Sequence, residues 1–572
     1  MSLKIEILQE IFVKKNGILN QKEFDKLFSL SVKLQRPLER IIMEKKLISQ
    51  RYLLQMLGSY FSVPSAELKI ADIDKEALKS INENFAVNNL VVPFAKEGNK
   101  LKVAMTDPLN KQLLQAMEKS TGMRIKPHIA LERSIRRVCV LYKGSVKEVL
   151  ERAMTHIGDK NMSEESSNKM LLNTIIESAV VIEASDIHIE PFEEDVFVRL
   201  RVDGMLRTII VLPKLFHEEM ISRIKVMSGL LMDEHRIPQD GRFHVNIENQ
   251  AVDVRVSIIP SYWGEKVAMR VLLKEGLLYD LTSLGLLASD LELIKKYIQR
   301  PFGMVLACGP TGSGKTTTLY SFIQQIGMEK IDVINISTIE DPIEYSIPRV
   351  TQMQIHPKVD LTFAVGLRAL LRQDPDIIMV GEIRDKETAN IAVRVSLTGR
   401  LLFSTLHTND AVSAIPRLLD IGIEPYLISS TLSLVIGQRL IRKICPHCRE
   451  SYVVDNKTME KIKQFYDYDY AVESLRKAGI LGKSEDPFSD IRFFRAKGCV
   501  QCDYLGYQGR TSVFEILEIS DEIKNLIMNA SRDCDYIKKA AMKNGFKTLS
   551  VDGLAKVILG ITDLDEVMRT TI

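Results

Sequence analysis

The sequence predicts a multidomain α/β protein whose core is a nucleotide-binding domain with a mostly parallel sheet. The chain has 572 residues, enough for roughly three or four domains that each bury a hydrophobic core. From about residue 286 onward, short apolar runs alternate with helix-compatible runs, the pattern of a parallel sheet covered by helices. A glycine-rich phosphate-binding motif at 309–316 directly follows one of these apolar runs.

The composition is that of an ordinary globular protein, with 45% hydrophobic and 26% charged residues. The 77 Lys and Arg residues nearly balance the 74 Asp and Glu residues, so the charge does not indicate a nucleic-acid partner. Charges interrupt the apolar N-terminal run, and no uncharged apolar stretch reaches the roughly 18 residues of a membrane span, so we expect a cytoplasmic protein. Four of the seven cysteines form two Cys-x-x-Cys pairs, which indicates metal binding in a reducing compartment.

Residues 1–150 are expected to form an N-terminal domain in two parts. In residues 1–60, apolar residues at helical spacing predict short amphipathic helices, among them 21–34 and 51–60. Residues 61–150 have the mixed pattern of an α/β unit. In this second part the expected strands are 90–94 and 101–105, and the expected helix is 107–117.

A linker, a second domain and the nucleotide-binding domain follow in that order. We assign the linker to 151–168, because 158–168 is polar and nearly free of apolar residues. The second domain is expected at 169–285, where the alternating run 196–202 meets Asp203-Gly204, a hairpin signal. Two further strands of this domain are expected at 252–259 and 266–273. The nucleotide-binding domain is expected at 286–572.

The phosphate-loop motif has the flanks that its chemistry requires. The apolar run 304–307 predicts a strand before it, and 317–322 predicts a helix after it. Backbone N–H groups of such a loop and the helix N-terminus together bind a polyphosphate. We expect Lys315 to reach the β- and γ-phosphates and the Thr316 hydroxyl to bind Mg²⁺.

Three further apolar runs end in polar residues suited to work on a phosphate. Glu340, Asp341 and Glu344 follow the first, Glu382 follows the second, and the third leads to His407. Carboxylates at strand ends beside a phosphate loop suit Mg²⁺ binding and water positioning. The three runs are 333–339, 376–380 and 402–406.

The order of these motifs resembles the secretion ATPase superfamily, and most closely its type IV pilus assembly and type II secretion ATPases. The resemblance covers nearly the whole chain and is most specific from about 170 to 515. It implies a RecA-like core, a PAS-like second domain that supplies arginines, and an N-terminal domain of the type II secretion ATPase kind. The motifs that carry it are the phosphate loop, Glu-Asp-Pro-Ile-Glu at 340–344, Arg-x-x-x-Arg-Gln-Asp-Pro-Asp at 368–376, Gly381-Glu382, and Ser-Thr-Leu-His-Thr-Asn-Asp at 404–410.

The resemblance also implies roles for the matching residues. Glu344 matches the glutamate that orients or deprotonates the attacking water, and Glu382 matches the Walker B glutamate that acts on Mg²⁺ with Thr316. His407 matches the histidine box. The arginines brought to the phosphates, or across subunits, are matched by Arg255, Arg270, Arg368 and Arg372. The matching nucleotide-binding residues are Gly309, Pro310, Thr311, Gly312, Ser313, Gly314, Lys315, Thr316 and Thr317.

One position departs from the family pattern. The family usually has histidine after Leu-Thr-Gly, whereas Arg400 follows Leu397-Thr398-Gly399 here. A fixed cation replaces a titratable group, so we do not expect a proton-sensitive contact at this position.

The two cysteine pairs are expected to form one zinc site. Cys445 and Cys448 form the first pair, and Cys499 and Cys502 form the second. Four thiolates make a closed tetrahedral site, whose role is structural, and His447 is expected to be a bystander. We assign this zinc-binding subdomain to about 441–515. Cys139, Cys308 and Cys534 are expected to be core thiols.

The N-terminal domain of some relatives binds cyclic di-GMP through repeated helix pairs. The matching segment here, 36–48, keeps Arg36 and the apolar spacing but has Leu38 and Lys45 where glycines are expected. Those glycines allow close approach of the backbone to a flat base. We therefore expect this domain to dock a partner protein rather than cyclic di-GMP.

The resemblance implies a cytoplasmic, Mg²⁺-dependent hexameric ATPase that acts beneath an inner-membrane platform protein and powers assembly of a type IV pilus. The sequence does not separate this function from that of a type II secretion ATPase. A retraction motor would lack the cysteine pairs and the long N-terminal domain. A scaffold with little turnover would not need Glu344 and Glu382, and a helicase would need a basic or aromatic binding surface.

Overall fold

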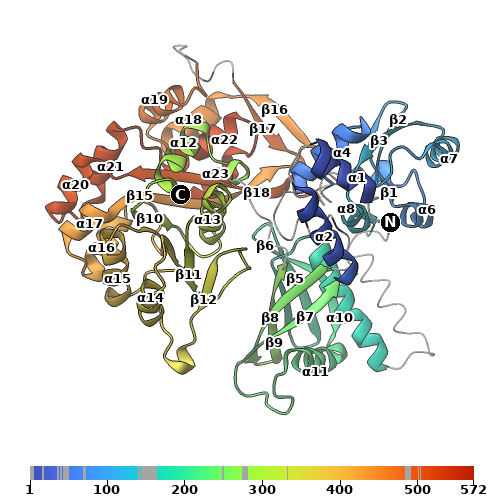
Figure 1. Ribbon diagram of the computed structural model, residues 1–572, viewed down its shortest axis with the longest axis horizontal. Helices are drawn as coiled ribbons and strands as arrows, with labels where there is room; N and C mark the ends of the chain where they lie inside the picture. Colours follow the sequence, from blue (N-terminus) through green and yellow to red (C-terminus); the bar gives the residue numbers. More distant parts are fainter. Residues whose placement is uncertain are drawn as a thin grey trace. The chain divides into compact units, whose positions relative to one another are not determined.

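The computed structural model describes residues 5–15, 19–34, 38, 42, 50–68, 73–139, 142, 164–247, 250–273, 281–330, 333–482, 488, 491–499, 502 and 504–571 (Figure 1). The chain divides into two compact units, 1–275 and 276–572, and each is described by itself. Among the described residues, no helix is both long enough and apolar enough to span a bilayer.

The N-terminal part of the first unit combines a helical cluster with a small sheet. The predicted helix 21–34 is α2, and the predicted strands form β1 and β2, which pair antiparallel, while β3 joins β2 in parallel. Asn110 caps the start of α7, and Gly122 ends that helix with a φ of +67°. The elements are α1 (Ile5–Gln9), η1 (Glu10–Lys15), α2 (Gln21–Leu34), α4 (Gln50–Phe61), α5 (Lys75–Leu78), α6 (Glu83–Asn89), β1 (Val91–Glu97), β2 (Lys100–Met105), α7 (Lys111–Thr121), β3 (Arg124–Ile129) and α8 (Glu132–Cys139).

The rest of the first unit is an antiparallel sheet with two helices. Six strands lie in the order β6-β5-β4-β9-β8-β7, and apolar residues of α10 and α11 share one core with them. Asp203 and Gly204 both have positive φ and turn β5 into β6, which confirms the predicted hairpin. The elements are α10 (Glu164–Val181), β4 (Asp186–Pro191), β5 (Asp195–Val202), β6 (Met205–Pro213), η4 (Lys214–Phe216), α11 (His217–Ser228), β7 (Gln239–Ile247), β8 (Gln250–Ser261) and β9 (Gly264–Leu273).

Part of the expected linker is helical. Residues 151–163 lie outside the described residues, but α10 already begins at Glu164, so the last five residues of 151–168 belong to a helix. Polarity alone therefore placed the end of the linker too late.

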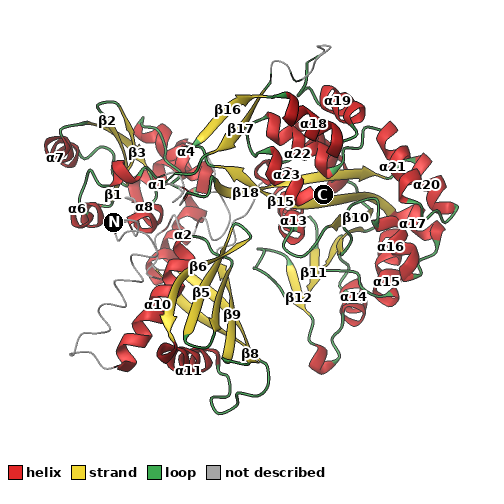
Figure 2. Ribbon diagram, turned by 180° about the vertical axis from the view of Figure 1, so that it is seen from behind, coloured by secondary structure: helices red, strands yellow, loops and turns green. Residues whose placement is uncertain are grey.

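The second unit is built on a seven-stranded sheet in the order β12-β11-β13-β14-β10-β15-β18. Figure 2 labels five of these strands, β12, β11, β10, β15 and β18, among the helices of the unit. The first six strands are parallel and only β18 is antiparallel, so the predicted mostly parallel sheet is confirmed. The elements up to β15 are η5 (Leu281–Leu284), α12 (Ala288–Ile298), β10 (Gly303–Cys308), α13 (Lys315–Lys330), β11 (Ile336–Glu340), β12 (Thr351–Gln354), η6 (Pro357–Val359), α14 (Phe363–Leu371), β13 (Ile377–Val380), α15 (Lys386–Leu397), β14 (Leu401–Leu406), α16 (Ala414–Ile421), α17 (Pro425–Thr431) and β15 (Leu432–Ile444).

The cysteine pairs lie in an insertion between the last two strands of this sheet. The insertion carries a two-stranded sheet of β16 and β17. Residues 441–444 and 507–515, assigned above to the zinc subdomain, are instead parts of β15 and β18, because those strands pair along nearly their whole length. The remaining elements are β16 (Arg449–Val453), α18 (Asn456–Phe465), α19 (Tyr468–Lys477), β17 (Arg492–Ala496), β18 (Tyr507–Glu518), α20 (Asp521–Met528), α21 (Cys534–Lys543), α22 (Leu549–Ile558) and α23 (Leu564–Thr571).

Candidate nucleotide site and cysteine cluster

The phosphate loop connects the central strand β10 to the start of α13. Gly309, Gly312 and Gly314 all have positive φ, which glycine adopts without strain. The buried Lys315 ammonium donates to the carbonyl oxygens of Gly309 (2.7 Å) and Pro310 (3.0 Å), and burial lowers its pKa. The Ser313 hydroxyl is buried and has no hydrogen-bond partner among the described residues. A lysine and a buried hydroxyl in a loop of this shape suit a phosphate ligand.

Gln438 of β15 lies beneath the phosphate loop and was missed from the sequence. Its side chain accepts a hydrogen bond from Thr318 of α13 (2.8 Å) and donates one to Ser512 of β18 (2.9 Å). A Cβ atom at Gly309 would lie 2.5 Å from the Gln438 carbonyl oxygen, and one at Gly314 would lie 2.8 Å from its side-chain nitrogen. Two of the loop glycines are therefore needed because Gln438 fills the space below them. The signal was an amide residue directly after the apolar run 434–437.

Glu382 and His407 meet at the ends of neighbouring strands. β13 pairs with β14 and β14 with β10, so their carboxyl ends lie at one edge with the phosphate loop. His407 Nε2 lies 3.2 Å from Glu382 Oε2, and Arg384 Nε lies 2.6 Å from the same oxygen. Arg384, two residues after Glu382, was also missed. The Glu382 carboxylate is nearly buried and lies between His407 and Arg384. A carboxylate in this place can accept a hydrogen bond from a metal-bound water, or bind a cation that also contacts a phosphate.

The acidic run after β11 holds one buried carboxylate, Glu340, and one partly buried carboxylate, Glu344. Glu340 is buried and accepts hydrogen bonds from the hydroxyls of Tyr320 and Thr338 and from Gln352. Burial raises the pKa of Glu340, which these donors partly offset. Glu344 lies in the following loop and is only partly buried. The geometry therefore favours Glu344 over Glu340 for a role toward solvent and ligand.

Arg368 and Arg372 lie toward the C-terminal end of α14. α14 runs back from the carboxyl edge to the amino end of β13, and Arg372 caps its C-terminus. Arg368 pairs with Glu387 of α15, and Arg372 donates to the Arg368 carbonyl oxygen (3.2 Å). Arg400, just before β14, binds the Pro375 carbonyl oxygen (3.0 Å) and Asp374 (3.2 Å). Arg400 thus fixes the turn after α14 with a charge that does not titrate.

Arg255 and Arg270 lie side by side on one face of the sheet in the first unit. They are paired in register on β8 and β9, and Arg242 of β7 is paired with Arg255 on the other side. Asp186 accepts a hydrogen bond from Arg270 Nε (3.2 Å) and forms an ion pair with Arg201, whose Nε lies 3.2 Å from the carboxylate. Four arginines share this row with one aspartate, so the row can bind an anion. Arg201 and Arg242 were missed, because cross-strand register is not visible in a single sequence.

The four paired cysteines converge on one point. Their sulfur atoms lie within 4.8 Å of one another. The Sγ atoms of Cys445 and Cys499 are 3.9 Å apart, those of Cys448 and Cys502 are 3.8 Å apart, and those of Cys499 and Cys502 are 3.7 Å apart. A zinc ion bound at about 2.3 Å by four thiolates holds them about 3.8 Å apart. Donor type and spacing therefore fit tetrahedral zinc. Of the other thiols, Cys139 and Cys308 are buried and Cys534 is partly buried.

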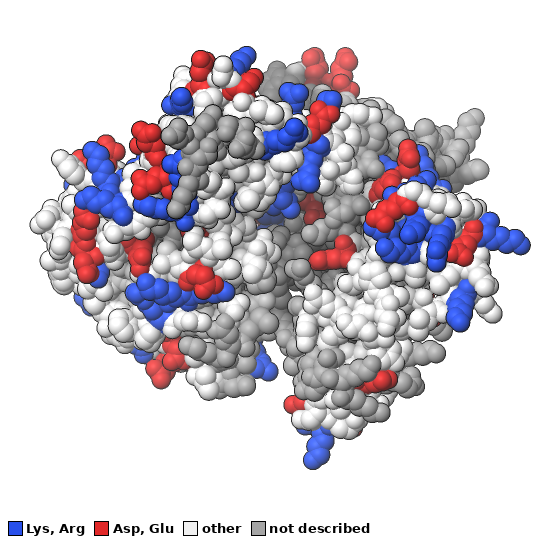
Figure 3. Space-filling model, turned by 90° about the horizontal axis from the view of Figure 1, so that it is seen from above, with Lys and Arg blue, Asp and Glu red and all other residues white. Residues whose placement is uncertain are grey.

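Charges of both signs are mixed over the surface. On the face drawn in Figure 3, Lys and Arg side chains lie among Asp and Glu side chains. This mixture matches the near balance of 77 basic and 74 acidic residues in the chain.

Two family profiles match this chain. The profile of the type II/IV secretion system protein family matches residues 161–569, and that of the MshEN domain matches residues 61–148. The expectation that cyclic di-GMP is not a ligand is not confirmed by these matches. Most of the segment behind that expectation, 36–48, lies outside the described residues.

Proteins similar to this chain include ATPases of type IV pilus assembly and of type II secretion. The type IV pilus assembly ATPase PilB of Myxococcus xanthus is 38% identical over 92% of this chain and 92% of its own length. The type II secretion system ATPase E of Vibrio cholerae is 45% identical over 70% of this chain and 75% of its own length. The solved structure of the ATPase DotB from Yersinia pseudotuberculosis is 20% identical, covers 70% of this chain and 92% of that chain, and has a TM-score of 0.51, a likeness of fold alone.

Proposed function

The chain belongs to the type II/IV secretion system protein family, and on that basis we propose that it is an ATPase motor that drives assembly of a type IV pilus. The observation that carries the enzymatic part is the meeting of Glu382 and His407 at the sheet edge that also holds the phosphate loop. The site can bind a polyphosphate and place the Glu382–His407 pair beside it.

The proposed reaction is hydrolysis of ATP bound to Mg²⁺. Lys315 and the loop N–H groups would hold the phosphates, while Thr316 and Glu382 would hold the ion or its waters. Mg²⁺ would supply charge neutralisation at the β- and γ-phosphates. Glu344 would align the attacking water, and His407 would keep Glu382 in place. Residues 309–317 would form the nucleotide cradle.

The arginines are proposed to act when subunits assemble. Arg368 and Arg372 of α14 would serve a neighbouring subunit in a hexameric ring. Arg255 and Arg270 would approach the phosphates by movement of the six-stranded domain. The ring would work under a membrane platform protein on the cytoplasmic side, and the N-terminal domain would dock a partner.

Pilus assembly is preferred to type II secretion because of coverage. The pilus ATPase aligns with 92% of this chain, whereas the secretion ATPase aligns with 70% of it despite higher identity. The alternative remains a pseudopilus ATPase of type II secretion, with the same chemistry and a different filament protein.

Turnover by the purified chain tests the enzymatic proposal. We expect release of phosphate from ATP that requires Mg²⁺ and stops when EDTA removes it. A Lys315→Ala protein purified in the same way reports any contaminating ATPase. The proposal would be contradicted if both proteins released phosphate at the same rate. It would also be contradicted if the wild-type protein, assembled as a ring, released no phosphate.

Zinc content tests the cysteine cluster. We expect about one zinc ion per chain by elemental analysis, because four converging thiolates form one closed site. Cys448→Ser should lose the zinc and lower the melting temperature, since metal binding contributes folding free energy, while nucleotide binding persists. The buried Cys308→Ser is the matched control and should retain the metal. A zinc-free wild-type protein prepared without chelators would refute the assignment.

A further inference from the structure

A carboxylate lies in the middle of the last strand of the central sheet, where an apolar residue would be expected. Glu515 of β18 is almost fully buried. Val513 and Leu517, which share its face of the strand, are fully buried in apolar clusters. A buried carboxylate is costly unless its oxygens are paired, so its partners define its purpose.

The Glu515 carboxylate joins two segments that are far apart in the sequence. One oxygen accepts a hydrogen bond from the backbone N–H of Ala411, four residues after His407. The other accepts one from the N–H of Leu549 (3.3 Å), the first residue of α22. That N–H is among the four at a helix start that have no partner within the helix.

The neighbouring strand makes room for this carboxylate. Gly437 of β15 is paired in register with Glu515. A Cβ atom at Gly437 would lie 2.5 Å from Glu515 Cγ. Burial raises the pKa of Glu515 to about 7, and the two N–H donors partly offset that rise. The fold therefore accommodates a costly group at one defined place.

The segment after His407 is a tight turn that Glu515 anchors to β18. Within the turn, the Thr408 hydroxyl donates to the Asp410 carbonyl oxygen (2.9 Å), and the Ser413 N–H donates to the Asp410 carboxylate (2.7 Å). These bonds give the turn its shape. The bond from Ala411 to Glu515 fixes the turn in position relative to the sheet, and so bears on where His407 meets Glu382.

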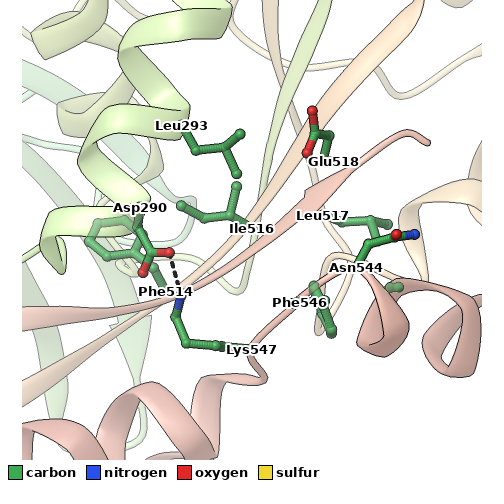
Figure 4. A pocket seen from close by; sticks show the side chains of 11 residues that line it. Asp290, Leu293, Phe514, Ile516, Leu517, Glu518, Asn544, Phe546 and Lys547 are labelled. Carbon is green, nitrogen blue, oxygen red and sulfur yellow. Dashed lines mark hydrogen bonds and ion pairs between the residues drawn. The ribbon is translucent and has the colours of Figure 1, made fainter. Parts of the chain in front are cut away.

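A second buried carboxylate, Asp290, holds the chain just before α22. Figure 4 shows Phe514 and Ile516 of β18 next to Asp290 of α12, which forms an ion pair with Lys547 (2.6 Å). Lys547 lies two residues before Leu549. The start of α22, whose Leu549 N–H donates to Glu515, is therefore also held in place by the Asp290 carboxylate.

We propose that Glu515 is a positioning residue for ATP hydrolysis, which holds the turn at 408–411 so that His407 stays against Glu382. This inference rests on the proposed ATPase function. Glu515 would touch neither nucleotide nor water; it would act through the backbone of Ala411.

The test is a Glu515→Gln variant of the full chain, measured alone and combined with His407→Ala. Glutamine keeps the size but cannot accept from both N–H groups. We expect kcat for ATP to fall about 10- to 100-fold with KM changed less than about threefold, because displacement of a catalytic group costs rate more than binding. In the His407→Ala background the same change should cost less than about twofold. Amide hydrogen exchange in peptides covering 408–413 should become faster.

Asp290→Asn is the matched control, since it removes a buried carboxylate that fixes the same helix start without touching the turn. It should lower the melting temperature and leave kcat and exchange at 408–413 near wild type. If Glu515→Gln does not fold, Gly437→Ala displaces the same carboxylate and replaces it in the test. Wild-type kcat in Glu515→Gln, or an equal loss in both backgrounds, would overturn the proposal. A wild-type protein without ATPase activity would instead refute the proposed function. Amide hydrogen exchange at 408–413 in Glu515→Gln would still show whether Glu515 holds the turn.

Discussion

A Glu344→Gln variant is expected to bind ATP like the wild type and to hydrolyse it at least about 100-fold more slowly. The substitution removes the charge that would align or deprotonate water, and it leaves the phosphate loop unchanged. Glu344 is only partly buried, in the loop after β11. Binding is measured with a fluorescent nucleotide and turnover by phosphate release.

Glu340→Gln is the matched control for this prediction. Glu340 is buried against Tyr320, Thr338 and Gln352, and its pKa is raised by burial, so a neutral isostere should keep turnover within about threefold of wild type. Wild-type turnover in Glu344→Gln, or a larger loss in Glu340→Gln, would transfer the catalytic role to Glu340 or Asp341.

An Arg270→Ala variant is expected to lose turnover by roughly 100-fold while nucleotide affinity changes much less. An arginine that approaches the γ-phosphate stabilises charge that develops mainly during its transfer. Arg270→Lys should recover part of the rate, because it keeps the charge but not the planar fork. Steady-state kinetics that separate kcat from KM provide the measurement.

Lys266→Ala controls for the loss of any cation from β9. Lys266 lies four residues before Arg270, on the same face, and pairs with Glu190 (2.7 Å). It should retain nearly full turnover. Full activity of Arg270→Ala, or of a shortened protein that begins near Leu286, would show that the second unit hydrolyses ATP without the arginine row.

The part of the site that follows from strand order could be predicted from the sequence. Glu382 and His407 end apolar runs, and parallel neighbouring strands bring such ends together. The cysteine cluster was predictable for a similar reason, because two short knuckles carry all four ligands. In both cases a local pattern determines the geometry.

Other parts depend on pairings that no local pattern encodes. Gln438 and Glu515 are buried polar residues within strands, and only the pairing of β15 with β18 places Gln438 beneath the phosphate loop and Glu515 against the turn after His407. That Arg242 lies next to Arg255 follows only from the register of β7 with β8, which the sequence does not show. Polar composition likewise hid the first residues of α10, which is already helical at Glu164.

The insertion between β15 and β18 has a consequence for the order in which the nucleotide domain folds. The Cys445 N–H at the start of the insertion donates to the Gly506 carbonyl oxygen at its end (2.9 Å), so pairing β18 with β15 closes the chain between them into a loop. Closing a free loop of roughly sixty residues costs about 2 kcal/mol more entropy than closing one of a few residues. Zinc bound by the four cysteines would hold the ends of this loop together before the strands meet. The metal would then act as a clasp during folding, and a cell short of zinc would make the sheet slowly.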